Sequence, residues 1–457
     1  MVVFLLIGLL VADGKTRNDR SPRALSARVV SLESNITHES ENEEAGHHHH
    51  HHHHQHHHSC EGRRVFVYNL SSWSSSLWDV QEEDLTFDAA FGEAEGLGGH
   101  LRLTRQWSAS QILYYRVSRS ACRTRDPKGA DVFVAPLWPK AKGFQRMLAA
   151  CNVSESTLLE ALPYLAPETA CRHLVLVAKS FRSCSSGRWF YDPVDPVFNK
   201  VAKFAYDEPL PWHPLLFPNA RQEPHLASYV RSPEGLVERC SYLGGNASAN
   251  CGNPPGRFPN IHSVPYPSSV HWSPGEPDPT TTTSSPRRPI LMLFVGHFDK
   301  GGLVRAGIRT MCREYDDPLV CTTSHATRDL AIKGQSVFCL EPPGDSPSRK
   351  SISDSLAFGC VPVVFENATA AQYSLFWTED ARVTIDYASF VSGAVDLRDH
   401  LESYSADRVR AMQQAVARCK KAFTYSFDDD VGDAIDIMLG AVARQTCANN
   451  YHSGVLR

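Results

Sequence analysis

The 457-residue sequence lacks the features that mark several large classes of protein. None of its thirteen cysteines forms a C-x-x-C pair, so the spacing of a zinc ribbon is absent. The formal net charge is only -4, and no basic run is interleaved with aromatic residues, which argues against a nucleic-acid partner. A Walker-type lysine motif is also missing, which disfavours a P-loop protein.

The acidic and histidine-rich segments do not indicate a metal site. Asp192–Asp195 reads D-P-V-D rather than D-x-D, and Asp428–Asp430 is expected in a late loop. The histidines of His47–His58 stand in a polar, low-complexity stretch outside any pattern typical of a fold, so we exclude them from the active site. We predict no metal ligands.

A hydrophobic run long enough to cross a bilayer is absent as well. Met1–Val11 is apolar, but it is shorter than the ~20 residues that a spanning helix needs, and it has no basic region before it. We interpret residues 1–13 as a signal peptide or a truncated signal anchor. The polar stretch that follows disfavours a buried helix, and we expect residues 14–60 to be a disordered, histidine-rich stem.

Cysteine usage and glycosylation sequons together favour a secretory compartment. Cys240 and Cys251 flank a short loop and are the simplest disulfide to propose. Cys339 and Cys360 are expected to be a poorer pair, because the helix between them should return the chain to the opposite end of the sheet. The odd total leaves at least one thiol unpaired within the chain. The sequons begin at Asn35, Asn69, Asn152, Asn246 and Asn367.

The most informative stretch runs from Ser336 to Glu366 and is typical of a strand, a turn, a helix and a second strand. Val337–Leu340 is a short apolar run that ends at the turn residues Pro342–Gly344. Asp345–Ser348 offers capping oxygens for a helix, which Gly359 should end. Val361–Phe365 is apolar on both faces, as a strand inside a parallel sheet should be.

Such a unit can hold a phosphate where the first strand ends and the helix begins. Arg349 and Lys350 are expected in the first helical turn, where cations are unfavourable unless an anion meets them. The alternative is that both are solvated and that Gly344 only makes the turn. The pattern alone leaves both interpretations open.

The stretch PPGDSPSRKSISDSLAFGCVPVVFE resembles the C-terminal signature of the exostosin family, glycosyltransferase family 47. The arginine of that signature corresponds to Arg349 or is replaced by Lys350. The residues that match are Cys339, Pro342, Gly344, Asp345, Ser346, Pro347, Ser348, Asp354, Gly359, Cys360, Pro362 and Val363.

Further segments extend the resemblance over roughly Arg63 to Ala443. RRVFVYNL is similar to the family's opening strand, and the segment containing Asp126 and Asp131 is similar to a later turn and strand. These two aspartates are expected to be structural. LMLFVGH resembles the strand that opens the C-terminal domain. It contains Gly296 and is followed by Arg305, and an arginine fork suits diphosphate oxygens.

The resemblance implies an α/β fold of the GT-B type, with two Rossmann-like domains facing a cleft. We expect an N-terminal, acceptor-side domain at residues 61–272 and a Pro/Thr linker at 273–289. The C-terminal, nucleotide-sugar-binding domain is expected at 290–448.

The implied function is inverting transfer of a sugar from a UDP-sugar to a polysaccharide or glycoprotein glycan. Asp345 and His173 are the candidates for the general base. We expect no tightly bound cofactor and no required metal. The residues assigned to the sugar nucleotide are Gly296, Arg305, Gly344, Ser346, Ser348, Arg349 and Asp354.

The expected setting is the Golgi lumen, as a type II membrane protein, or elsewhere in the secretory pathway. A homodimer or a heterodimer with a related transferase is a further expectation. The alternative function is a non-catalytic luminal subunit that binds glycans and pairs with an active homologue. UDP binding without turnover would distinguish this alternative from the enzyme.

Overall fold

A computed structural model describes the folded part of the chain. All described residues belong to the unit His58–Arg457 and not to the preceding unit, Met1–His57. The predicted targeting segment, the stem up to Ser59, the Cys240–Cys251 pair, Asp345 and Ser346 lie outside the described residues. The described residues are 60, 63–68, 86–135, 159–176, 178, 197–206, 261–280, 288–298, 302–324, 330–344, 348–365, 369, 373 and 375–445.

The first of two parallel sheets contains strands from the N-terminal half of the chain. Its order is β4-β1-β5-β6-β7-β8, and every neighbouring pair runs parallel. Its central strands are buried on both faces, which requires near-continuous apolar runs such as Val132–Ala135. The strands are β1 (Val65–Val67), β4 (Arg123–Thr124), β5 (Val132–Ala135), β6 (His173–Leu176), β7 (Ala202–Ala205) and β8 (Ile261–Ser263).

The second parallel sheet follows in the chain and has the order β10-β9-β11-β12-β13. The predicted strands before and after the proline-rich turn are β11 and β12, and the apolar run LMLFV lies in β9. The strands are β9 (Ile290–Val295), β10 (Cys321–Ser324), β11 (Ser336–Glu341), β12 (Val361–Val364) and β13 (Val383–Thr384). The α/β architecture with two sheet domains is confirmed.

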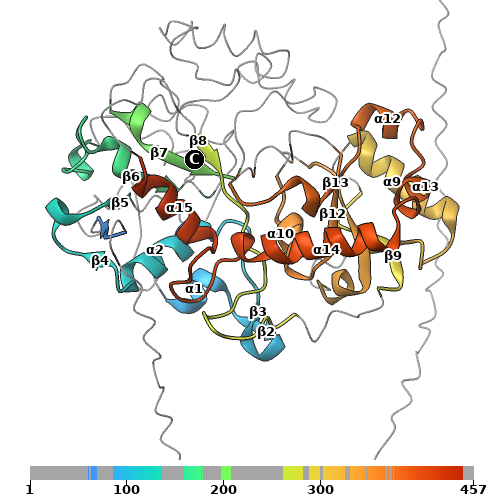
Figure 1. Cartoon of the computed structure of the whole chain (residues 1–457), viewed down its shortest axis with the longest axis horizontal. Coiled ribbons are helices and arrows are strands. Elements are labelled where there is room, and N and C mark those ends of the chain that lie inside the picture. The colour runs from blue at the N-terminus through green and yellow to red at the C-terminus, as the bar shows by residue number, and fades with distance from the viewer. Residues whose placement is uncertain are drawn as a thin grey trace, which may run out of the picture. The chain divides into compact units, whose positions relative to one another are not determined.

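Helices accompany both sheets (Figure 1). Those near the first sheet are α1 (Phe87–Phe91) and α2 (Ala109–Arg119). Those that follow β9 in the chain are α9 (Gly302–Tyr315), α10 (Lys350–Ala357), α12 (Tyr387–Val391), α13 (Leu397–Glu402), α14 (Ala406–Lys420) and α15 (Ala434–Ala443).

Shorter elements complete the described fold. A two-stranded antiparallel ribbon is formed by β2 (Ala94–Gly96) and β3 (Leu101–Arg102). The 3-10 turns are η3 (Leu97–Gly99), η4 (Pro127–Gly129), η5 (Ala170–Arg172), η7 (Phe198–Lys200), η9 (Leu330–Gln335), η10 (Glu379–Ala381) and η11 (Lys421–Phe423). Asp126 caps η4 by accepting a hydrogen bond from the Lys128 amide, and Asp131 accepts one from the Arg64 amide. Both aspartates therefore have the structural roles expected of them.

Helix α10 begins later than the sequence predicts. Its first helical residue is Lys350, and Arg349 is the N-cap with an extended backbone (φ -151°, ψ 141°). The expected placement of Arg349 in the first turn is therefore wrong. The reason is local, because the Arg349 guanidinium reaches back and donates from Nη1 to the Pro342 carbonyl at 2.6 Å.

The view of Cys339 and Cys360 as a poor pair is also wrong, since they form a disulfide. The short helix α10 does return the chain to the start of the next strand. Cys360 then directly precedes β12, whose Val361 is in register with Phe338, the residue before Cys339. Cys339 lies within β11 rather than beyond its end, so the two sulfurs meet across neighbouring strands. Among pairs of described residues, disulfides also join Cys60 to Cys122 and Cys312 to Cys321.

The C-terminal helix α15 packs on the first sheet, not on the second that precedes it in the chain. It contacts β5 and β6, and Figure 1 shows it beside them. Arg116 of α2 is paired with Asp433, the N-cap of α15, and both side chains are buried. Burial raises the pKa of Asp433, against the opposing effect of Arg116.

Part of the predicted Pro/Thr linker packs against helices of the C-terminal half. Thr280 is buried and donates to the Ala357 carbonyl at 2.9 Å, and Asp278 pairs with Lys420. The domain boundaries themselves stay predictions. Within the described ranges, no helix is both long and apolar enough to cross a membrane.

Candidate functional site

The second sheet reverses its strand order between β9 and β11. The chain leaves β9 toward β10 on one side and leaves β11 toward β12 on the other. In open α/β sheets, ligands bind outside the carboxyl ends of the strands at such a reversal. The turns that follow Val295 and Glu341 are therefore the first place to look for a site.

Two arginines link these turns crosswise. Arg305, on α9 after β9, donates from Nη1 to the His297 carbonyl at 2.9 Å and lies against Gly344, after β11. Arg349, after β11, holds the Pro342 carbonyl and lies against Gly296, after β9. Each guanidinium thus holds the turn of its own strand and contacts the turn of the other.

The two glycines permit this approach. An ideal Cβ on Gly344 would stand 3.1 Å from Arg305 Nη2, and one on Gly296 would stand 3.5 Å from Arg349 Nη2. Gly296 also has a φ of 153°, a backbone conformation that side chains rarely adopt. A Cβ on Gly344 would crowd the Arg305 guanidinium, whereas one on Gly296 would first crowd Phe294 Cζ, at 3.1 Å.

The arrangement suits an anionic ligand. Guanidinium groups present planar forks of donors that match phosphate oxygens. Helix α9 begins at Gly302 after β9, and α10 begins at Lys350 after β11, so the amino-terminal ends of both helices follow the same two strand ends. Such ends carry free N–H groups and a partial positive charge.

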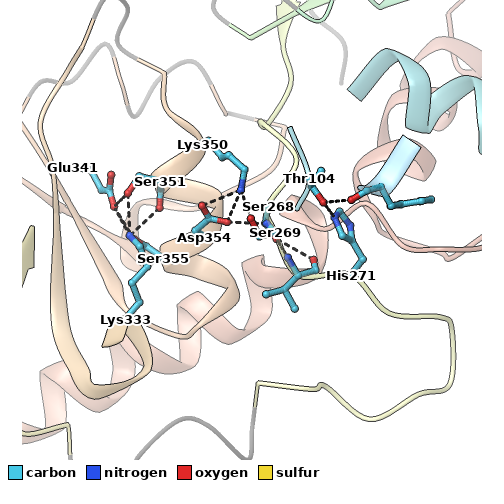
Figure 2. A network of polar contacts seen from close by, with 12 residues as sticks. Thr104, Ser268, Ser269, His271, Lys333, Glu341, Lys350, Ser351, Asp354 and Ser355 are labelled. Carbon is cyan, nitrogen blue, oxygen red and sulfur yellow. Dashed lines mark hydrogen bonds and ion pairs between the residues drawn. The ribbon is translucent and has the colours of Figure 1, made fainter. Parts of the chain in front are cut away.

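Polar side chains on one side of α10 bind the segment that follows β8 of the first sheet and contains Ser269 and His271 (Figure 2). The Asp354 carboxylate accepts from the Ser269 amide at 2.8 Å and from Lys350 Nζ at 3.0 Å. Lys350 Nζ also donates to Ser269 Oγ at 2.6 Å. Asp354 therefore attaches this segment to the helix at the candidate site.

Other polar side chains on α10 surround a buried ion pair (Figure 2). Lys333 Nζ lies 3.1 Å from Glu341 Oε1, and their side chains are 2% and 1% exposed. Ser351 and Ser355 donate to the same carboxylate oxygen at 2.9 and 2.7 Å. The network fixes the last residue of β11, directly before the Pro342–Gly344 turn. Sequence reasoning missed this pair, because nothing in the spacing connects η9 with the strand end.

The segment from the first sheet ends in a further buried contact, at the right of Figure 2. His271 donates from Nδ1 to the Tyr425 carbonyl at 2.7 Å, and its Nε2 lies 2.8 Å from Thr104 Oγ1. Burial lowers the pKa of His271 to about 3. The segment is thus held at Ser269 by α10 and at His271 by residues from both halves of the chain.

His173 lies away from these turns, at the amino end of β6. Its Nδ1 donates to the Thr169 carbonyl at 2.9 Å, so its Nε2 accepts from the Tyr68 hydroxyl at 2.7 Å. Its ring stacks on Phe133 at 4.6 Å, and burial lowers its pKa to about 4. These contacts favour a structural role, because both ring nitrogens are engaged.

The structure brings four of the predicted donor-site residues together: Gly296, Arg305, Gly344 and Arg349. Ser348 is buried directly before Arg349, while the observed contacts of Asp354 are with Ser269 and Lys350. Contact of any of these residues with a ligand stays a prediction. In the described part of the chain, no group of three or more His, Cys, Asp or Glu is placed to hold a metal.

The two parallel sheets make this an α/β protein with two sheet domains. Two arginines lie where the second sheet reverses its strand order. Residues 250–391 match the Exostosin GT47 domain. The matched range includes the segment after β8, the turns after β9 and β11, and α10. This part of the chain is thus similar in sequence to the exostosin-type glycosyltransferases, as the resemblance implies.

Individual proteins are also similar to the chain in sequence. The chain is 25% identical over 360 residues to "Xyloglucan-specific galacturonosyltransferase 1" of Arabidopsis thaliana, an alignment that covers 71% of this chain and 47% of that protein. It is also 25% identical over 379 residues to "Probable xyloglucan galactosyltransferase GT17" of the same plant, covering 76% and 72%. The chain thus spans about half the length of the first relative.

Solved structures also overlap with the chain. The "OtsA apo structure" aligns with 84% of this chain and 99% of its own, at 11% identity and a TM-score of 0.32.

Proposed function

We propose that this chain transfers a sugar from a UDP-sugar to a polysaccharide acceptor, with inversion at the anomeric carbon. The crosswise contact of Arg305 and Arg349 with the turns after β9 and β11 is the observation that carries the proposal. As the glycosidic bond to the donor breaks, negative charge develops on the departing diphosphate. Two preorganised guanidinium groups stabilise that charge without a metal ion.

The comparisons support a polysaccharide as the acceptor. The two relatives described above are named as xyloglucan transferases, one for galacturonosyl and one for galactosyl groups. Disulfides such as Cys339–Cys360 support synthesis in an oxidising compartment, and we place the reaction in the secretory pathway.

The test is a transfer assay on the purified luminal protein. It uses a panel of UDP-sugars with xyloglucan oligosaccharides, and UDP binding is measured by calorimetry. Proton NMR of the product reports the anomeric configuration. Arg305→Ala and Arg349→Ala should each weaken UDP binding by about tenfold or more, the equivalent of about 1.4 kcal/mol.

The matched control is Arg313→Ala, because Arg313 is exposed on the same helix as Arg305. This variant should bind UDP as the wild type does. Normal UDP binding by both site variants would remove the assignment. UDP binding without turnover would instead favour the alternative of a non-catalytic glycan-binding subunit.

Independence from metal is part of the proposal. Turnover should persist in EDTA, and deletion of His47–His58 should leave the rate unchanged. A loss of turnover in EDTA that Mn²⁺ restores would contradict this part and leave the arginine assignment standing.

We propose Asp345 as the general base, because it follows Gly344 in the signature turn. Asp345→Asn should keep the melting temperature and lower the rate by about 100-fold or more. A near-normal rate in this variant would refute the assignment.

A further inference from the structure

An exposed tryptophan stands directly before α2. Trp107 is 37% exposed, and it is preceded by the exposed polar residues Arg105 and Gln106. Its ring lies 5.8 Å from that of Tyr206 and 6.0 Å from that of Tyr266. Trp107 is thus the partly open member of an aromatic cluster.

The two tyrosines behind it form a rigid support. Their rings are stacked at 3.8 Å with an interplanar angle of 17°, and both residues are buried. The Tyr206 hydroxyl accepts from the Ala109 amide at 3.4 Å, in the first turn of α2. An indole held against a fixed pair of rings loses little conformational freedom when a ligand stacks on it.

Hydrogen bonds place this cluster at the carboxyl edge of the first sheet. Ser110 Oγ donates to the carbonyl of Leu176, the last residue of β6, and accepts from the Ala178 amide. Tyr206 directly follows β7, and Tyr266 follows β8. This is the edge at which α/β sheets bind ligands.

The cluster is also connected to the candidate donor site. Three residues beyond Tyr266, the Ser269 amide donates to Asp354 of α10, and Ser269 Oγ accepts from Lys350. One short segment therefore runs from the aromatic cluster to the amino-terminal end of α10. The residue before Lys350 is Arg349, so the segment connects the aromatic cluster with the helix that follows the Arg349 turn.

We propose that Trp107 is the stacking platform of the acceptor site, and that its ligand is a neutral β-linked glycan. The equatorial hydroxyls of a β-linked glucan leave faces of C–H groups, and these pack against the flat, electron-rich face of an indole. Arg105 and Gln106 supply hydrogen-bond donors for hydroxyls at the rim. This inference rests on the proposed function, because it assigns the acceptor of the same reaction.

The test measures glycan binding by the full-length protein in the absence of donor. Cellohexaose and a xyloglucan oligosaccharide are the probes, and calorimetry gives the affinity. Trp107→Ala should weaken binding by about tenfold, as loss of an aromatic anchor commonly does. Trp107→Phe keeps an aromatic face and should lie between the alanine variant and the wild type.

The control is Leu319→Ala, which removes an apolar side chain that is 57% exposed just before β10, an edge strand of the second sheet. It should bind glycan as the wild type does. UDP affinity and melting temperature are measured on every variant. An unchanged UDP affinity in Trp107→Ala shows that the fold and the donor site are intact.

Two results would overturn the proposal. The first is equal glycan binding by the wild type and Trp107→Ala. The second is that the wild type binds neither probe, which would leave the aromatic cluster as a surface for another class of partner. Trp107-dependent glycan binding by a protein that neither binds UDP nor transfers sugar would keep the platform and refute the proposed function.

Discussion

Gly344 determines where the Arg305 guanidinium can lie. In Gly344→Ala, the new Cβ would stand 3.1 Å from Arg305 Nη2, which is tighter than ordinary van der Waals contact. The guanidinium must move by a few tenths of an ångström. We expect UDP affinity to fall by about tenfold, which corresponds to about 1.4 kcal/mol, and calorimetry measures it.

A suitable comparison is Gly96→Ala in the β2–β3 ribbon. The added methyl there would meet Leu101 Cδ2 at an ordinary 3.6 Å, and φ is close to 180°. If the two alanine variants bind UDP equally well, Gly344 does not position Arg305 for the nucleotide.

His173 should make stability depend on pH. Burial lowers its pKa from 6.5 to about 4, so the folded protein holds the ring neutral while the unfolded chain takes up a proton below about pH 6.5. The stabilising contribution is present above pH 6.5 and is lost as the pH falls toward 4. We expect the melting temperature of His173→Phe to change less over this window than that of the wild type. Equal slopes would mean that His173 does not titrate in this way.

Single residues could be predicted where a strand end and a family motif coincide. Gly296, Arg305, Gly344 and Arg349 all follow recognisable apolar strands, and the structure gathers them. His173 also precedes a recognisable strand, but a sequence does not say that Tyr68 and Thr169 engage both of its nitrogens. Those contacts come from segments that fold together only in three dimensions.

At the scale of elements, the Lys333–Glu341 pair should hold β11 and α10 together. Lys333→Met would leave the Glu341 carboxylate buried without its counter-ion, and breaking a buried pair on one side costs about 3–5 kcal/mol. Chemical denaturation measures the loss. Lys333→Met/Glu341→Gln removes both charges and should recover much of it.

The comparison for this element is Arg398→Met, which breaks the exposed pair with Glu402 on α13. Exposed pairs contribute little, so this variant should unfold close to the wild type. A Lys333→Met protein of wild-type stability would show that the serines of α10 satisfy Glu341 without the lysine.

The elements themselves were easier to predict than their ends. Apolar runs identify β9, β11 and β12, because a parallel strand buried on both faces must be apolar throughout. The start of α10 was misplaced, because the capping side chains of Asp345–Ser348 are a weaker local signal than the reach of Arg349 back to Pro342. The Cys339–Cys360 disulfide depends on strand register, which the sequence does not contain.

At the scale of the whole molecule, sequence could separate the two sheets but could not assign α15. The apolar residues of Ala434–Ala443 indicate a buried helix without saying which sheet it covers. Chain order suggests the second sheet, whereas the helix packs on β5 and β6 of the first. The end of the described chain therefore returns to the first sheet.

The buried Arg116–Asp433 pair tests this return. Arg116→Met leaves the Asp433 carboxylate buried without its counter-ion, while the hydrogen bonds from the Ser426 and Asp436 amides remain. We expect a loss of about 3–5 kcal/mol in the free energy of unfolding. Hydrogen exchange should become faster in α15 and, together with it, in β5 and β6. Arg119→Met, one turn later and over the Tyr115 ring, is the comparison and should leave exchange unchanged. Faster exchange in α15 alone would show that the helix opens independently, and that the first sheet is stable without it.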